Sequence, residues 1–503
     1  MQKLILLISY AILLTVLSGC YEKTPTQPNI VIIYADDLGI GDVSCYQAGT
    51  LNTPGIDRIA AEGIRFTNGY ATAATCTPSR YSLLTGEYPW RNERARVLAG
   101  NSALLIDTTA NTLPKLHRAN GYATAVVGKW HLGLGDGNIN WNVPITMGAN
   151  EVGFEHSYIM AATNDRVPTV YVDNGNVVNL DVNDPIEVSY YKNFEGEPTG
   201  RENPELLKIH PSHGHDNSIT NGISRIGYMK GGKSALWVDE DMADNFLDKA
   251  KQFVSQNKNN PFFLFYALHQ PHVPRVPNQR FAGSSGMGPR GDAILEADWC
   301  VNEFLKTLDE LGLSENTLVI FSSDNGPVLD DGYQDQSDVL IGEHTPWGNF
   351  RGGKYSLYDA GTHVPFMARW KGQIKPGVSD ALISQVDLYA SIAALLNSEN
   401  TRPDSQNLLD ALTGKTTTGR SQHITEGLQG RIAYREGDWI LIPSYKGGKK
   451  ISWGVDIETG FSSEPQLYNV KEDPGQQNDL AAEMPEKVQQ MQKEFNAIKS
   501  NPQ

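Results

Sequence analysis

Four uninterrupted apolar runs mark the chain of 503 residues. They cover residues 29–37, 123–133, 261–274 and 317–326, and each ends in polar or ionisable residues. β-Branched and aromatic residues fill these runs, which is typical of strands buried on both faces in a parallel sheet covered by helices. Helical patterns lie between them, at 55–66, 112–122 and 297–313. The alternation predicts an α/β fold with a large mixed, mostly parallel sheet between layers of helices.

The composition changes after residue 400. Residues 401–420 are rich in Thr, Asp and Gly, residues 431–444 alternate as short strands, and residues 485–499 have a polar helical pattern. We therefore predict a catalytic domain at 29–400 and a smaller C-terminal α+β domain at 401–503, with an antiparallel sheet and a helix. A long polar segment, residues 134–260, separates the second and third apolar runs. Segments of this length in a compact enzyme are usually functional.

The first residues predict export. Residues 1–19 combine a basic start with an apolar stretch, as in a secretory signal peptide, and 17–20 resemble the lipobox of bacterial lipoproteins, in which the cysteine, here Cys20, is lipidated. The alternative is an ordinary signal peptide that happens to contain Cys20. Residues 20–28 are polar and suit a tether. We expect a periplasmic or outer-membrane lipoprotein of a bacterium, with a lipid anchor as its sole membrane attachment.

The net charge limits the classes of partner, and the cysteine content limits the disulfides that can form. A formal net charge of −16 argues against a nucleic-acid partner, because phosphates require a basic surface. An anionic substrate must therefore meet a local basic pocket. After export, Cys45, Cys76 and Cys300 would lie in an oxidising compartment, but three cysteines cannot all pair with one another, and sequence leaves the pairing of Cys45 and Cys300 open.

Two of the strand ends carry hard oxygen ligands. Asp36 and Asp37 end the first run, and Asp324 and Asn325 end the fourth. Taken singly, such pairs are more often turns or helix caps. The carboxyl ends of parallel strands meet at one edge of a sheet, so we expect the four side chains to converge. Carboxylate and amide oxygens favour Ca²⁺, with Mg²⁺ possible, over zinc.

Other groups at the same edge suit an oxyanion. Lys129, His131, His272 and Arg80 supply cations and proton-transfer groups, which could hold a tetrahedral oxyanion and move protons to its ester oxygen. Cys76 stands two residues before a proline, which predicts a helix that begins at this cysteine. The free N–H groups of a helix start favour anions and activate a nucleophile.

These motifs resemble a known family. The segment CTPSRYSLLTG, residues 76–86, resembles the CxPSRxxLLTG signature of the type I sulfatases of the alkaline-phosphatase superfamily, and GYATAVVGKWHLG, residues 121–133, resembles their second signature. The segments ADDLG, PHVP, SSDNG and RGGKYSLYDAGTHVPF follow in the family's order. The resemblance covers nearly the whole chain after the signal peptide. It implies hydrolysis of sulfate esters.

The resemblance also implies cofactors and roles. Cys76 would be oxidised by a formylglycine-generating enzyme to formylglycine, whose hydrate is the nucleophile on Ca²⁺. By motif, the metal would be bound by Asp36, Asp37, Asp324, Asn325 and the modified residue 76. Arg80 would steady the hydrate, Lys129 and Lys354 would clamp the sulfate oxygens, His272 would protonate the leaving oxygen, and His131 would take a proton from the hydrate.

The substrate hypothesis rests on the long polar segment. Residues 164–175 and 210–217 resemble segments of bacterial sulfatases that remove 6-O-sulfate from galactose or N-acetylgalactosamine. A sulfated oligosaccharide is then the substrate, with Asp165, Arg166 and His215 as candidates for contacts with it. The alternative for Asp165 and Arg166 is a surface ion pair or support of the loop; for His215 it is a solvated loop.

Two rival functions remain at this point. The first is a phosphoesterase or phosphonate hydrolase of the same superfamily, since a site for one tetrahedral oxyanion can serve another. The second is an inactive, glycan-binding surface lipoprotein that keeps the fold. The intact set of candidate catalytic residues speaks against the second alternative, because an idle site would be free to lose some of them.

Overall fold

The computed structural model describes residues 27–49 and 51–500. The predicted signal peptide, the lipidation site Cys20 and most of the tether lie outside the described residues. Within the described part of the chain, none of the helices has the length and apolar character needed to cross a membrane.

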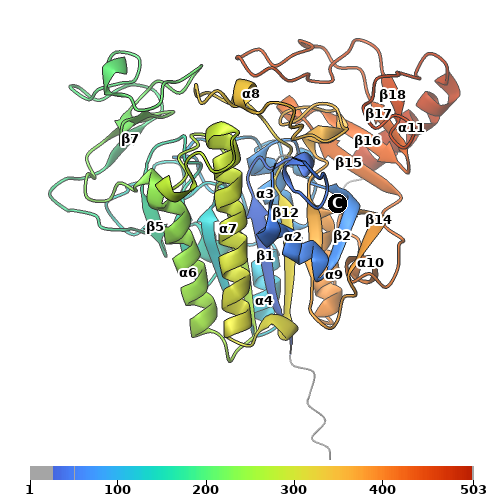
Figure 1. Cartoon of the computed structure of the whole chain (residues 1–503), viewed down its shortest axis with the longest axis horizontal. Coiled ribbons are helices and arrows are strands. Elements are labelled where there is room, and N and C mark those ends of the chain that lie inside the picture. The colour runs from blue at the N-terminus through green and yellow to red at the C-terminus, as the bar shows by residue number, and fades with distance from the viewer. Residues whose placement is uncertain (1–26, 50, 501–503) are drawn as a thin grey trace, which may run out of the picture.

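A ten-stranded mixed sheet forms the centre of the molecule (Figure 1). Four neighbouring strands in its middle run parallel, in the order β12, β1, β11 and β3, and they are the four apolar runs of the sequence. Strand β13 runs antiparallel to β12 and β2, and β5 and β6 are antiparallel additions at the other edge. The predicted fold class is confirmed. In sheet order the strands are β14 (Gly377–Ser384), β2 (Ile64–Tyr70), β13 (Phe366–Arg369), β12 (Thr317–Ser323), β1 (Asn29–Ala35), β11 (Phe262–Ala267), β3 (Ala123–Lys129), β4 (His156–Met160), β5 (Tyr171–Asp173) and β6 (Asn176–Val177).

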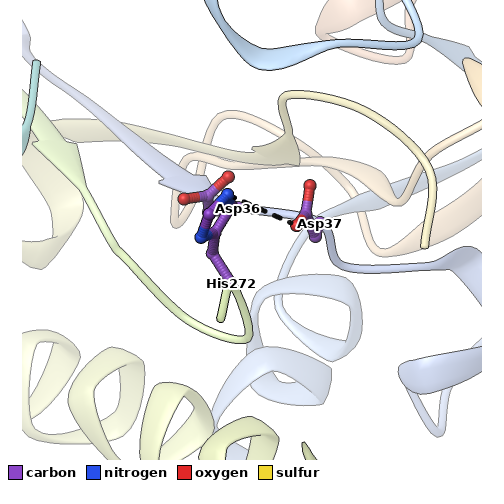
Figure 2. A group of neighbouring side chains, drawn as sticks. All are labelled: Asp36, Asp37 and His272. Carbon is purple, nitrogen blue, oxygen red and sulfur yellow. Dashed lines mark ion pairs between the residues drawn. The ribbon is translucent and has the colours of Figure 1, made fainter. Parts of the chain in front are cut away.

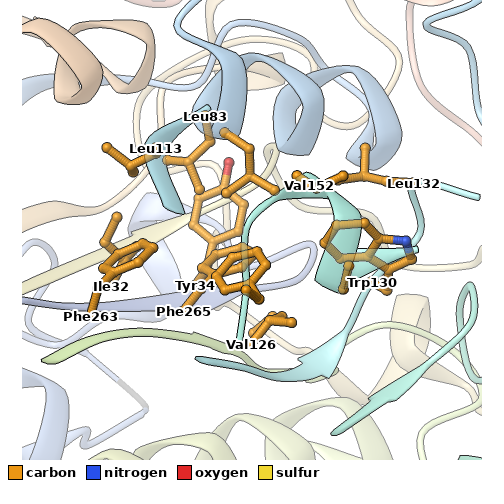
Figure 3. Packing of buried hydrophobic residues seen from close by; sticks show 14 of the residues in the cluster. Ile32, Tyr34, Leu83, Leu113, Val126, Trp130, Leu132, Val152, Phe263 and Phe265 are labelled. Carbon is orange, nitrogen blue, oxygen red and sulfur yellow. The ribbon is translucent and has the colours of Figure 1, made fainter. Parts of the chain in front are cut away.

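Helices cover both faces of this sheet, so its central strands β1, β11 and β12 have no solvated side. In β1, Ile32 and Tyr34 join one hydrophobic core while Val31 and Ile33 join the other, which explains the unbroken apolar signal. The first core is packed by α3 (Cys76–Thr85), α4 (Leu113–Ala119) and α9 (Leu388–Leu395), and part of it is drawn in Figure 3. The second is packed by α2 (Pro54–Ala61), α6 (Met242–Gln256) and α7 (Gly288–Glu310).

Two predicted helices have different ends in the structure. The helix expected over 55–66 ends at Ala61, because the next residues alternate between buried and half-buried positions and form β2. The helix expected from residue 297 begins earlier, at Gly288. Its first turns bury polar side chains such as Arg290 and Asp292, so they carry little apolar periodicity.

The long polar segment 134–260 is only partly an insertion. Strands β4 to β6 extend the main sheet and α6 packs on it, so these parts belong to the catalytic core. Residues 178–241, between β6 and α6, form the excursion proper. This excursion and the loops around it carry only short elements: α5 (Ala149–Val152), β7 (Glu187–Ser189), β8 (Ile219–Thr220), β9 (Ile223–Ser224), β10 (Tyr228–Lys230) and α8 (Ser337–Leu340).

The C-terminal part forms a separate four-stranded antiparallel sheet with a final helix, as predicted. Its elements are β15 (Gln422–Glu426), β16 (Ile432–Glu436), β17 (Trp439–Ile442), β18 (Gln466–Asn469) and α11 (Pro485–Ser500), and the preceding α10 (Leu409–Leu412) packs against β14. The end of β15 also joins the segment before α3, since the Ala74 N–H donates to the Glu426 carbonyl (2.6 Å). This junction brings the small domain to the edge of the candidate site.

Candidate active site

The polar residues predicted at the strand ends do converge. Asp36 and Asp37 follow β1, Asp324 follows β12, and Lys129 ends β3. The central strands are parallel neighbours, so their ends meet at one edge, as the sequence predicted. Asp37 has a φ of 62° and His131 one of 55°, a left-handed backbone conformation that costs energy outside glycine and clusters at functional sites.

An oxygen cluster at this edge has unused acceptors. The Asn325 amide donates to Asp37 Oδ1 (2.7 Å), and the Asp37 N–H points at Asp324 Oδ1 (3.3 Å). Asp36 Oδ1 and Asn325 Oδ1 are buried and have no hydrogen-bond partner among the described residues. Burial and the charge of Asp324 raise the pKa of Asp36 well above its usual range. Orphaned hard oxygens beside crowded carboxylates fit a divalent cation.

Three buried cations face these carboxylates. Lys129 Nζ lies 2.6 Å from Asp36 Oδ2. The Arg80 guanidinium lies 2.8 Å from Asp324 Oδ2, and its Nη1 donates to the Lys129 carbonyl (3.1 Å). The third cation, Lys354, lies 2.8 Å from Asp37 Oδ2. All three are withdrawn from solvent, so their charges act on the site with little screening.

A further carboxylate, Asp331, adds a fourth negative charge to the site. Its Oδ2 lies 2.8 Å from Lys354 Nζ, and its carboxylate also accepts from the Tyr355 hydroxyl. Burial would lower the pKa of Lys354, but Asp331 and Asp37 hold it well above its usual range. Asp331 was not predicted from the sequence. With it, four carboxylates face three cations, and one divalent ion would leave a net positive site for an anionic ester.

Cys76 begins helix α3, as predicted. Its Sγ lies 3.2 Å from His131 Nδ1, and His131 Nε2 lies 2.9 Å from the Leu98 carbonyl. A carbonyl only accepts, so Nε2 carries the proton and Nδ1 presents a lone pair to residue 76. Burial and Lys129 hold the pKa of His131 well below its usual range, so the ring is neutral. His131 is therefore placed as a proton acceptor for residue 76.

His272 lines the same pocket as Cys76. Its Nδ1 donates to the Val273 carbonyl (2.6 Å), which leaves Nε2 directed at Asp37 Oδ2, 3.9 Å away (Figure 2). Asp36, Asp37 and His272 also bring one ligand atom each within 4.8 Å of one another, so a metal could gain a nitrogen ligand here. The hard oxygens favour the assignment of His272 to proton transfer. Burial and Lys354 hold the pKa of its ring well below the usual range.

The three predicted sugar contacts form one group, in which Asp165 and His215 are buried and Arg166 is half-buried. Arg166 Nη1 lies 2.7 Å from Asp165 Oδ1, and His215 Nε2 lies 2.9 Å from Asp165 Oδ2. Asp165 is 2% exposed, so the surface ion pair considered from the sequence is wrong. Burial would raise the pKa of Asp165, but Arg166 holds it well below its usual range. Support of the loop remains compatible with this arrangement.

One pocket of about 540 Å³ connects Cys76, His272 and Lys354 with the group around Asp165. Helix α3, the excursion and the C-terminal domain each supply part of its wall. Its lining includes Cys76, His272, Lys354, Asp165, Arg166 and His215, together with Tyr355 and with four residues outside the sequence motifs, Asp331, Arg96, Glu426 and Trp453. The excursion therefore lines the same pocket as Cys76, as expected of a functional insertion.

The cysteines form no disulfide in the described structure. Cys45, Cys76 and Cys300 are all free thiols. Burial raises the pKa of Cys45 to about 12 and that of Cys300 well above its usual range. Cys45 and Cys300 are therefore packing residues, whereas Cys76 opens onto the pocket.

This fold and site define an ester hydrolase that acts on a tetrahedral oxyanion, with buried cations, a proton acceptor beside Cys76 and a second histidine, His272, that lines the pocket. The family model described as "Sulfatase" matches residues 28–398, and the chain belongs to the sulfatase family, which hydrolyses sulfate esters. The chain is 50% identical over 499 residues to an N-acetylgalactosamine-6-O-sulfatase of Bacteroides thetaiotaomicron (97% of each chain covered). It is 31% identical over 491 residues to human arylsulfatase A (93% of this chain and 86% of the relative). A structure solved in connection with glycosaminoglycan metabolism by Bacteroides thetaiotaomicron superposes with a TM-score of 0.93 at 50% identity, covering 95% of this chain and 100% of that one.

Proposed function

We propose that this sulfatase removes 6-O-sulfate from N-acetylgalactosamine or galactose units of sulfated oligosaccharides. The observation that carries the proposal is the 50% identity, over 97% of the chain, to a protein named for that activity. The group of Asp165, Arg166 and His215 supports it, since a carboxylate and a guanidinium in the same pocket as the reacting residue suit sugar hydroxyls.

The proposal includes Ca²⁺, with Mg²⁺ as the alternative, and formylglycine made from Cys76 by a formylglycine-generating enzyme. Asp36, Asp37, Asp324 and Asn325 would hold the metal, in keeping with the unpaired oxygens of Asp36 and Asn325. When present, the metal ion supplies Lewis-acid polarisation and the formylglycine hydrate supplies the attacking oxygen.

The remaining residues position the ester and move its protons. Lys129 and Lys354 would bind the sulfate oxygens, and Arg80, which pairs with Asp324, would steady the hydrate at position 76. The negative charge of the bound ester favours a protonated His272, whose free Nε2 can then donate to the leaving sugar oxygen. His131 Nδ1 would accept a proton from residue 76, because Leu98 holds the other ring nitrogen.

The proposed location is the periplasm or outer membrane, with the lipid on Cys20 as the anchor. The signal-like residues 1–19 and the lipobox-like residues 17–20 support this placement. An anchored sulfatase would meet polysaccharide fragments at the cell surface.

The test is desulfation of defined monosaccharides by protein produced together with the maturing enzyme. Release of sulfate is measured from 2-, 4- and 6-O-sulfated N-acetylgalactosamine and galactose, with the matched phosphate esters as controls. We expect turnover of the 6-O-sulfates. A preference for phosphate esters, or for another sulfate position, would contradict the proposal. Mass spectrometry of the peptide that contains residue 76 shows in parallel whether formylglycine has formed.

A further inference from the structure

The C-terminal domain supplies one wall of the pocket. Residues 427–430, between β15 and β16, line the cavity together with Arg96, which lies in the segment after α3. Gly430 has a φ of 69°, and a Cβ there would lie only 2.3 Å from Arg96 Nη2. The guanidinium therefore lies directly on this loop, and the loop needs glycine at that position.

Only one nitrogen of Arg96, Nη1, donates hydrogen bonds to the described residues. Its Nη1 donates to the Ala95 carbonyl (2.7 Å) and to Glu426 Oε1 (3.3 Å). Its Nε and Nη2 have no hydrogen-bond acceptor among the described residues, and the side chain is 40% exposed. These two nitrogens form the fork that binds a carboxylate or a sulfate with paired hydrogen bonds.

Glu426 does not cancel the charge of Arg96. It is 1% exposed, and its Oε2 has no hydrogen-bond partner among the described residues. Burial raises the pKa of Glu426 to about 8, although Arg96 opposes the shift. At neutral pH the carboxyl group is therefore mostly protonated, and Arg96 keeps its positive charge. In a chain with a net charge of −16, this is a local basic point on the pocket wall.

Arg96 is tied to the reacting centre without belonging to it. The Leu98 carbonyl accepts from His131, and the Leu98 N–H points at Thr77 Oγ1 (3.4 Å), so the backbone two residues beyond Arg96 is held beside residue 76. None of the contacts of Arg96 involves the oxygen cluster or the group around Asp165. It is thus a separate cation in the same pocket.

We propose that Arg96 binds an anionic substituent, a carboxylate or a second sulfate ester, on the sugar unit joined to the one that loses its sulfate. The proposal rests on the proposed function, because it requires an oligosaccharide in the pocket. The free fork of Arg96 makes two hydrogen bonds to this group, while Glu426 and Gly430 keep the guanidinium in place as positioning residues.

The test compares the binding of matched disaccharides to metal-loaded protein that carries Cys76→Ala, so that no ligand is consumed. Each disaccharide contains 6-O-sulfated N-acetylgalactosamine, joined to a uronic acid, to the same sugar with its carboxyl group reduced to an alcohol, or to a neutral sugar with a sulfate ester. We expect the charged partners to bind roughly tenfold or more tighter than the neutral one, as for a charge-assisted pair. Comparison of the two charged ligands identifies which anion the subsite takes.

In Arg96→Gln the ratio of charged to neutral dissociation constants should fall close to one. Arg96→Lys, which keeps the charge but loses the fork, should give an intermediate ratio. The matched control is Arg431→Gln, an exposed arginine that follows the same loop but does not line the pocket, and it should keep the original ratio. An unchanged ratio in folded Arg96→Gln, or equal affinities in the parent protein, would overturn the proposal. Failure of the parent enzyme to release 6-O-sulfate would instead overturn the proposed function.

Discussion

The substitution Asp165→Asn tests whether Asp165 binds the sugar or only supports the loop around it. The carboxylate is 2% exposed and lies 2.7 Å from Arg166 Nη1 and 2.9 Å from His215 Nε2. Asparagine keeps the shape and one carbonyl acceptor but removes the charge and the second acceptor oxygen. The substitution therefore weakens the ion pair with Arg166 without opening a cavity.

The expected magnitude follows from the bonds that are weakened. A hydrogen bond to a charged group contributes about 1.5–3 kcal/mol, so kcat/KM on a sulfated sugar should fall roughly ten- to a hundredfold if Asp165 and Arg166 hold the sugar.

The stability of the fold should change too, because Arg166 holds the pKa of Asp165 well below its usual range. Such a carboxylate stabilises the fold above its unfolded pKa of about 4, and this contribution is lost as the pH falls through the lower folded pKa. The stability gap between wild type and Asp165→Asn should therefore be widest at neutral pH and close in acid.

The assay uses two substrates for each enzyme. N-Acetylgalactosamine 6-sulfate reports sugar binding, whereas a small aryl sulfate has no sugar hydroxyls and reports the sulfate chemistry alone. The matched control is Asp216→Asn, which lies in the excursion next to His215 and pairs with Arg201, whose side chain is 71% exposed. We expect Asp165→Asn to lose activity selectively on the sugar, and the control to retain it. An equal loss on both substrates would show that Asp165 supports the loop and would refute its role in sugar binding.

Three shorter predictions concern the core of the site and the fold. Cys76→Ala should abolish turnover while the melting temperature stays close to that of the wild type, since this side chain faces the pocket; residual activity with every substrate would remove Cys76 as the nucleophile position. Asp324→Asn should lower the bound metal, measured by elemental analysis, and the activity together. Asp324→Ala should in addition lose about 3–5 kcal/mol of stability, because it also removes the oxygen that accepts from the buried Arg80 guanidinium, which asparagine can replace. Burial raises the pKa of Glu296 to about 7, so its contribution to stability is lost as the pH rises through 7, and Glu296→Gln should be more stable than the wild type at pH 8 by up to about 3 kcal/mol. The free Oε1 of Gln270 can accept from the new amide, and denaturation curves at pH 5 and pH 8 that show no such difference would contradict the raised pKa.

The sequence predicted the centre of the fold well because the four central strands are buried on both faces. Such strands leave an unbroken apolar run, and their polar last residues necessarily share one edge of the sheet. For this reason the convergence of Asp36, Asp37, Asp324 and Asn325 was predictable from the sequence alone. The same logic predicted the helix that begins at Cys76, since proline in a first turn is a local signal.

The rest depends on contacts that leave no local signal. Asp331 meets Lys354 from an irregular loop, and Glu426 meets Arg96 across 330 positions of sequence, at the junction of two domains. The start of α7 was missed because Arg290 and its neighbours bury charge where an apolar residue was expected. Polar groups that are buried in pairs break the periodicity on which sequence interpretation depends.

The surroundings of Cys76 make it a poor thiol nucleophile. Burial raises its pKa even though Lys129 and Lys354 oppose the shift, and the same burial lowers the pKa of His131, the base 3.2 Å from its sulfur. Proton transfer from this thiol to this imidazole is therefore unfavourable for both partners, unlike the thiolate–imidazolium pairs of thiol enzymes. A site with two neutral histidines, three cations and unpaired hard oxygens is suited to oxygen nucleophiles instead. The formylglycine proposed at position 76 would supply such an oxygen nucleophile.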